Sequence, residues 1–246
     1  MIDLEQFAAG LQLDPGGIWR TQQAFEEISY PETRHQELAH VEDNSYWFRH
    51  RCDLLLEIMG RFPPSGPLFD LGGGNGTIVK HMLERGYEAV VVEPILSGAV
   101  NARLQGVPTV ICATVESAGF HPGSLPAVGL FDVLEHFDDD ELFLRKIHAL
   151  LRPGGSLYLY VPALPWLWSV EDAYVGHFRR YALESLCAKL RRLGFEISFG
   201  SYLFWFLVMP IFFLRVLPSR LGTIQGGKAE RLYAASRTPT GLLGRL

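Results

Sequence analysis

The chain is 246 residues long, of which 48% are hydrophobic and 20% charged, and its formal net charge is −5. This length predicts one domain with additions and a sizeable core, and the negative charge argues against a nucleic-acid partner. Cys52, Cys112 and Cys187 are widely spaced, so we interpret them as reduced thiols rather than metal ligands. The first residues are acidic and lack a cationic leader, so we expect a cytoplasmic protein.

The predicted elements alternate between strand and helix after an irregular start. Residues 1–40 show no hydrophobic period, and we expect helix and loop there. A helix is predicted within 40–62 because apolar residues recur at helical spacing, and the prolines of 63–67 end it. Strands are then expected at 68–71, 88–93, 108–112, 127–133 and 155–161, and helices at 77–86, 95–104, 139–151 and 182–193.

This alternation predicts an α/β fold with a doubly wound, mostly parallel sheet, since parallel neighbours need a crossover connection. Residues 195–202 read as a sixth strand, and no seventh strand is evident after residue 217. We therefore expect three parts: a helical or looped segment at 1–45, a core at 46–202, and an apolar then basic extension at 203–246.

A glycine-rich turn follows the first predicted core strand. Asp70-Leu71-Gly72-Gly73-Gly74-Asn75-Gly76 joins that strand to a helix, and Glu93 ends the next strand. Glycines let backbone N–H groups approach a ligand closely, and a carboxylate accepts hydrogen bonds from a ribose diol. The pattern predicts a nucleoside-containing cofactor. Thr77 stands where a dinucleotide fold would carry its third glycine.

The glycine pattern resembles motif I of the class I S-adenosylmethionine-dependent methyltransferases. Two further segments, 129–136 and 151–159, resemble that family's motifs after the fourth strand and before the fifth. The chain also resembles bacterial methyltransferases of types 11 and 12. The resemblance implies a Rossmann-like fold with S-adenosyl-L-methionine as cofactor.

The resemblance also implies a set of cofactor contacts. Asp70 would contact the methionine portion, the glycines would form the backbone wall, and Glu93 would bind the ribose. Arg51 is expected to bind the methionine carboxylate, with Arg49 as the alternative, or else to be a surface arginine. The full expected set is Asp70, Gly72, Gly74, Gly76, Glu93, Ile95, Thr114, Phe131, Asp132 and Arg51.

The acceptor side centres on Asp132, Glu135 and His136, which stand at i, i+3 and i+4, and on the distant His177. This set resembles the divalent-metal site of small-RNA 2′-O-methyltransferases and the acid-x-x-Glu-His of ubiquinone-biosynthesis O-methyltransferases. As metal ligands, the four would hold an ion such as Mg²⁺ that activates the acceptor oxygen. Without a metal, His136 or His177 would act as general base beside Glu135. A structural role in the loop is the third alternative.

An apolar segment, 202–214, is followed by basic residues. At thirteen residues, it is shorter than the ~20 that span a bilayer. The segment is expected to contact the inner face of a membrane, to pack on the core, or to form a lid over a lipid-like substrate.

The function expected from these motifs is O-methylation of a small-molecule, glycan or lipid-linked acceptor, without a nucleic-acid partner. One alternative is a catalytically idle cofactor fold that docks on a membrane or partner through 202–214. Another is aminopropyl transfer on the same fold, which the lack of extra acids around Asp132 disfavours.

Overall fold

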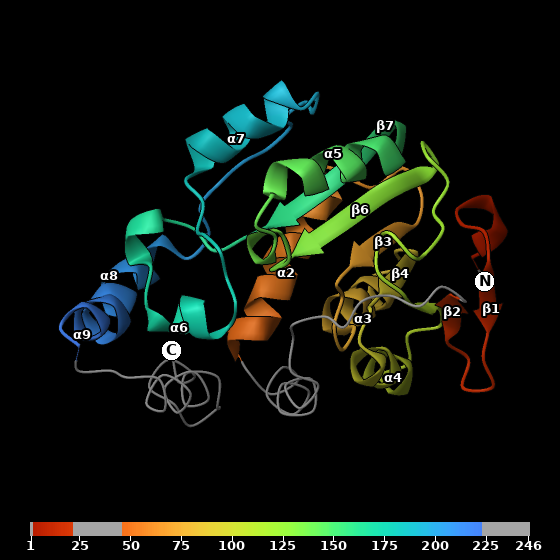
Figure 1. Cartoon of the computed structure of the whole chain (residues 1–246), viewed down its shortest axis with the longest axis horizontal. Helices are drawn as coiled ribbons and strands as arrows, with labels where there is room; N and C mark the ends of the chain where they lie inside the picture. The colour runs from red at the N-terminus through yellow and green to blue at the C-terminus, as the bar shows by residue number, and fades with distance from the viewer. Residues whose placement is uncertain (1, 22–45, 223–246) are drawn as a thin grey trace. The chain divides into compact units, whose positions relative to one another are not determined.

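In the computed structural model, the structure describes residues 2–21 and 46–222 (Figure 1). Of these, 2–21, 46–131 and 149–159 belong to a first compact unit, and 132–148 and 160–222 belong to a second. The three parts expected from the sequence, with boundaries at 45/46 and 202/203, divide the chain differently from these two units. That division stays a prediction.

The first unit is built on a seven-stranded sheet with the order β1-β2-β5-β4-β3-β6-β7. The pairs β2–β5, β5–β4, β4–β3 and β3–β6 are parallel, and β1–β2 is antiparallel. The expectation of a mostly parallel α/β sheet is thus confirmed. The strands are β1 (Leu11–Leu13), β2 (Trp19–Thr21), β3 (Leu68–Leu71), β4 (Ala89–Val92), β5 (Val110–Cys112), β6 (Leu125–Phe131) and β7 (Leu151–Tyr160).

The central strands are buried along their whole length. All residues of β3, β4 and β6 are buried, as expected for parallel strands whose two faces are both covered. The helices α2 (Tyr46–Arg61), α3 (Thr77–Glu84) and α4 (Leu96–Leu104) precede or connect these strands. Each lies where its hydrophobic spacing predicts a helix, although residues 40–45 of the first one lie outside the described residues.

The N-terminal residues form a hairpin, which corrects the prediction of helix and loop. Asp14 holds the turn between β1 and β2, because its Oδ1 accepts the Ile18 N–H at 2.9 Å and its Oδ2 accepts Arg20 Nε at 2.8 Å. In β2, Trp19 pairs with Ile111 of β5. Strands of three residues are too short to show a period, but the Asp-Pro-Gly-Gly sequence between them was a turn signal.

The expected strand at 195–202 is wrong, because these residues adopt no regular structure. The Phe195 ring packs edge-on against His148, with ring centroids 4.9 Å apart, and Gly200 interrupts the short apolar alternation. The additional strands of the sheet therefore come from the N-terminal hairpin.

The second unit is mainly helical. Its longer helices are α5 (Asp140–Leu150), whose last residues belong to the first unit, α6 (Val170–Tyr174) and α7 (Leu183–Arg192). A helical run follows: η4 (Trp205–Leu207), α8 (Val208–Ile211), the π-helical turn η5 (Phe212–Val216) and α9 (Leu217–Arg220). Within the described parts of the chain, no helix combines the length and apolarity needed to cross a membrane.

Candidate active site

The turn after β3 has the backbone of a ligand-binding loop. Gly72, Gly74 and Gly76 have φ angles of 75°, 54° and 78°, a region that favours glycine. The Gly72 N–H donates to Val92 O at 2.8 Å, which joins the turn to the end of β4. Gly76 is the N-cap of α3, so the loop leads directly into the N-terminus of a helix.

At two positions of this loop, neighbouring atoms lie too close for any side chain, so only glycine fits. A Cβ on Gly76 would lie 2.9 Å from the Cβ of Ala102 in α4. A Cβ on Gly73 would lie 2.9 Å from Asp70 Oδ2. The loop is therefore held against α4 on one side and against the buried acid on the other.

Glu93 lies at the carboxyl end of β4 and binds the loop through both of its oxygens. Oε2 accepts the Gly74 N–H at 2.9 Å, and Oε1 accepts the Ile95 N–H at 2.8 Å. Burial raises the pKa of this carboxyl to about 7, although the same two backbone hydrogen bonds act in the opposite direction. Each carboxylate oxygen accepts more than one hydrogen bond, so the interaction with the loop is compatible with binding a diol.

Asp70 is buried at the end of β3, with 1% of its surface exposed. Burial and the nearby charge of Glu93 raise its pKa to about 7, although the charge of Arg51 acts in the opposite direction. Asp70 Oδ1 has no hydrogen-bond partner within the described residues. A buried carboxylate that retains an open acceptor position suits a cationic or hydrogen-bonding ligand.

The two arginines considered for this site differ in burial. Arg51 is buried and its guanidinium lies 4.9 Å from the centroid of the Phe48 ring, whereas Arg49 is exposed. Because Arg51 is also the arginine that acts on the pKa of Asp70, the structure favours Arg51 over Arg49 for the site.

The remaining predicted cofactor residues follow the strand ends. Ile95 is the N-cap of α4, and Phe131, at the end of β6, is buried. Thr114 follows β5 and forms a reciprocal turn with Ser117, in which each backbone N–H donates to the other residue's hydroxyl. That turn occupies the Thr114 side chain, so its expected role in cofactor binding rests only on its position after β5.

The second unit brings three of the four residues predicted for the acceptor side together. The ligand atoms of Glu135, His136 and His177 all lie within 4.8 Å of one another. Glu135 is fully buried, and its Oε1 lies 3.8 Å from His177 Nε2. The His136 and His177 rings meet edge-on, with centroids 4.9 Å apart. The Phe178 N–H donates to the Glu135 carbonyl at 2.8 Å, which holds the two loops together.

Asp132, the fourth expected ligand, is not part of this group. It directly follows β6, and its φ angle is 58°, whereas the i, i+3, i+4 argument assumed right-handed helical backbone from this residue. The short helix η2 spans only Leu134–His136. The left-handed conformation at Asp132 therefore breaks the predicted shared face.

Sequence reasoning missed Asp172. Its Oδ1 lies 3.2 Å from His177 Nδ1 and accepts Arg180 Nε at 2.8 Å. Burial raises its pKa, but the hydrogen bond with His177, the charge and hydrogen bond of Arg180 and the Ser169 N–H outweigh it, so the pKa is lowered. Asp172 is therefore ionised at neutral pH. The Ser169-x-x-Asp172 capping box of α6 was the available signal.

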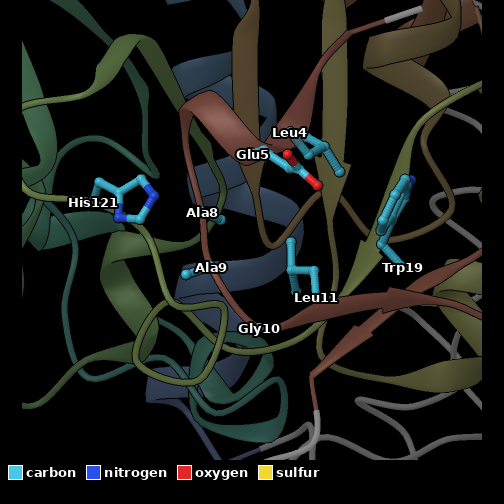
Figure 2. Close-up of a pocket in the computed structure, with 8 residues that line it drawn as sticks. All are labelled: Leu4, Glu5, Ala8, Ala9, Gly10, Leu11, Trp19 and His121. Carbon is cyan, nitrogen blue, oxygen red and sulfur yellow. The ribbon is translucent and has the colours of Figure 1, made fainter.

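A separate pocket of about 320 Å³ lies beside the N-terminal hairpin (Figure 2). Its lining includes Glu5, Trp19 and His121, and it contains none of the predicted site residues. Figure 2 shows Trp19 and His121 on opposite sides of the 4–11 segment.

Several known proteins are similar to this chain. Residues 39–198 match the family model described as a methyltransferase domain. The ubiquinone biosynthesis O-methyltransferase of Xanthomonas campestris pv. campestris (strain B100) is 29% identical over 102 residues, which are 39% of this chain and 43% of that protein. The chain thus aligns with less than half the length of this curated relative.

Two solved structures share the fold. Haemonchus contortus phosphoethanolamine N-methyltransferase 2, in complex with S-adenosyl-L-methionine, superposes with a TM-score of 0.56 at 19% identity, over 85% of this chain and 53% of that one. A SAM-dependent methyltransferase of Thermotoga maritima gives a TM-score of 0.50 at 21% identity, over 67% of this chain and 77% of that one. Because the family model covers more than half of its residues, the chain belongs to the methyltransferase domain family.

Proposed function

We propose that the chain is an S-adenosylmethionine-dependent O-methyltransferase that acts on a small-molecule, glycan or lipid-linked acceptor. The observation that carries the acceptor chemistry is the Asp172–His177 pair, with Nδ1 and Oδ1 3.2 Å apart, beside the buried Glu135. The glycine loop of the first unit would bind the cofactor, and the Glu135–His136–His177 cluster of the second would activate the acceptor.

The residues of the first unit fit the cofactor. Asp70 offers a buried carboxylate oxygen that is unpartnered among the described residues, and this suits the ammonium of the methionine portion. Glu93 would receive the ribose hydroxyls, and Arg51 the methionine carboxylate. The cofactor, when bound, supplies an electrophilic methyl group on a positively charged sulfur. The residues around it position the reactants and exclude water.

His177 is the group we assign to proton transfer. The ionised Asp172 accepts a hydrogen bond from Nδ1–H, which fixes the tautomer and leaves the Nε2 lone pair to take a proton. Nε2 would take the proton of the acceptor hydroxyl, which would make the acceptor oxygen nucleophilic toward the methyl group that the cofactor supplies. Asp172 and Glu135 would stabilise the imidazolium that forms.

The same cluster supports a metal-assisted variant of this function. Two imidazoles and one carboxylate, with ligand atoms within 4.8 Å of one another, form a donor set that suits a divalent transition ion better than Mg²⁺, which prefers oxygen ligands. Asp172 would then orient His177 as a ligand. Such an ion, when bound, would lower the pKa of the acceptor hydroxyl.

The function is tested in two steps on the full chain. Calorimetry with S-adenosylmethionine should show binding; a folded protein that gives no heat would end the proposal. The chain is then incubated with a phenol, a catechol or a sugar, with and without a chelator. Mass spectrometry detects any methyl ether that forms on their hydroxyl groups. We expect His177→Ala to abolish turnover while cofactor binding is kept, and His148→Gln, an exposed histidine of α5, to act as the unaffected control.

The chelator separates the two variants of the proposal. Turnover that persists in the chelator assigns His177 as the base, whereas turnover lost and then restored by Mn²⁺ or Zn²⁺ assigns the metal. A chain that binds the cofactor but methylates none of these hydroxyls contradicts O-methylation of these classes and favours the idle docking module.

A further inference from the structure

One side of the helical run of residues 205–220 packs against other residues of the second unit. Arg215 Nη1 lies 2.9 Å from Glu171 Oε2, and Ser219 Oγ accepts the Val170 N–H at 3.1 Å. The Phe212 ring lies 5.8 Å from that of Trp166, and Val216 is fully buried. This inner side is therefore fixed against η3 (Pro165–Leu167) and α6.

The other side of the run is apolar and exposed. Trp205, Phe206, Met209 and Phe213, which we call the outer face, have exposed fractions of 76%, 56%, 57% and 52%. Their spacing places them along one side of a helix. A surface helix of a globular protein normally carries polar residues on the side that faces water. Four large apolar side chains in that position indicate a binding surface.

The charge of the chain is divided sharply along the sequence. Residues 197–246 contain six basic residues and one acid, Glu230, a net charge of +5. Since the whole chain carries −5, residues 1–196 carry −10. The basic residues are Arg215, Arg220, Lys228, Arg231, Arg237 and Arg245, of which the last four lie outside the described residues.

We propose that the outer face inserts into the surface of an anionic membrane, and that the net positive charge of residues 197–246 adds attraction to the headgroups. Tryptophan and phenylalanine favour the boundary between headgroups and acyl chains. Basic residues next to such a face add attraction to anionic lipid. This places a peripheral membrane function on a surface separate from the residues assigned to methyl transfer.

The charge distribution favours lipid over a protein partner as the occupant. An interface for a second copy of this chain would bring two segments of the same positive sign together, which is unfavourable. An anionic bilayer complements the whole segment at once, since it offers an apolar layer for the outer face and negative headgroups for the flanking cations.

The test is flotation of the full chain with vesicles of phosphatidylcholine, with and without phosphatidylglycerol. We expect the chain to float with the anionic vesicles at low salt, and to bind neutral vesicles about tenfold more weakly. The double variant Trp205→Ser/Phe213→Ser should lose flotation. The matched control is Leu142→Ser, because Leu142 is an apolar residue of α5 with a similar exposed fraction, 51%.

Circular dichroism and cofactor binding confirm that each variant is folded. Absence of flotation with anionic vesicles overturns the proposal, as does equal binding by the double variant. A wild-type chain that stays with the solvent but self-associates, and becomes monomeric in the double variant, assigns the outer face to a second copy instead. If the anionic and neutral vesicles bind equally, the electrostatic part of the proposal is wrong.

Discussion

The Glu93 carboxylate accepts a hydrogen bond from the Gly74 N–H at 2.9 Å, which connects the end of β4 to the loop after β3. Through its other oxygen the same side chain holds the Ile95 N–H at the start of α4. The residue predicted to bind ribose therefore also organises the loop that would surround the cofactor. Its roles in stability and in binding should be separable by substitution.

Substituting Glu93 tests this double role. Glu93→Ala leaves two backbone donors without their acceptor, so we expect the free energy of unfolding to fall by about 1–3 kcal/mol. Cofactor affinity should fall as well, by about tenfold or more, since the ribose acceptor is lost. Thermal unfolding and calorimetry measure the two effects, and Glu84→Gln, an exposed carboxylate of α3, is the control. Unchanged affinity in Glu93→Ala would show that Glu93 serves the loop alone.

The contact between Gly76 and α4 is tested by comparing two glycines with similar backbones. Gly76 and Gly86 have φ angles of 78° and 84°, but only Gly76 lies against a neighbour. Gly86→Ala should cost about 1–2 kcal/mol through its left-handed conformation. Gly76→Ala should cost clearly more and should weaken cofactor binding. Chemical denaturation measures the difference, and equal losses would show that α4 yields to the added methyl.

The buried acids predict a pH dependence of stability for the unliganded protein. The pKa of Asp70 and that of Glu93 are each raised to about 7 in the folded chain, whereas unfolded values are about 3.9 and 4.3. Between the unfolded and folded pKa values, the folded state binds more protons than the unfolded state, so stability falls as the pH rises. The stabilisation from the two protonated carboxyl groups is complete below pH ~4 and is lost as pH rises through ~7. The melting temperature should be lower at pH 8 than at pH 5.5. Asp70→Asn should reduce that difference, and an unchanged difference would contradict the assignment.

Asp172 should act on the reaction through His177. In Asp172→Asn, the amide no longer favours the Nδ1–H tautomer or stabilises the imidazolium, so we expect kcat to fall by about a hundredfold or more, while KM changes little. Steady-state kinetics measure kcat and KM separately, whereas a purely structural role would lower the amount of folded protein without lowering the kcat of the folded fraction.

Sequence patterns were sufficient for the central sheet and for the cofactor loop, because both depend on local signals. The apolar runs at 68–71 and 89–92 are bounded by turns, and four glycines within five positions directly after a strand indicate a tight turn with positive φ angles. The pairing of Glu135, His136 and His177 was also predictable, since a familiar motif supplied the spacing.

The missed features depend on backbone conformation and strand pairing rather than on a hydrophobic period. Asp172 approaches His177 only because the loop between them turns back on itself, with the His177 N–H donating to the Asp172 carbonyl at 2.9 Å. The left-handed backbone at Asp132 is uncommon for a residue with a side chain, and no local pattern indicates it. The hairpin strands are stabilised by pairing with β5, which lies some ninety residues later.

That hairpin has a practical consequence for anyone who shortens the chain. Because β2 pairs with β5, Ile111 and Cys112 have a neighbouring strand on that edge of β5. Removal of the first 21 residues would leave β5 as an open edge, with backbone groups available to β-strands of other molecules. Truncated preparations should therefore aggregate through strand addition, and affinity tags are better placed where they leave the first strands undisturbed.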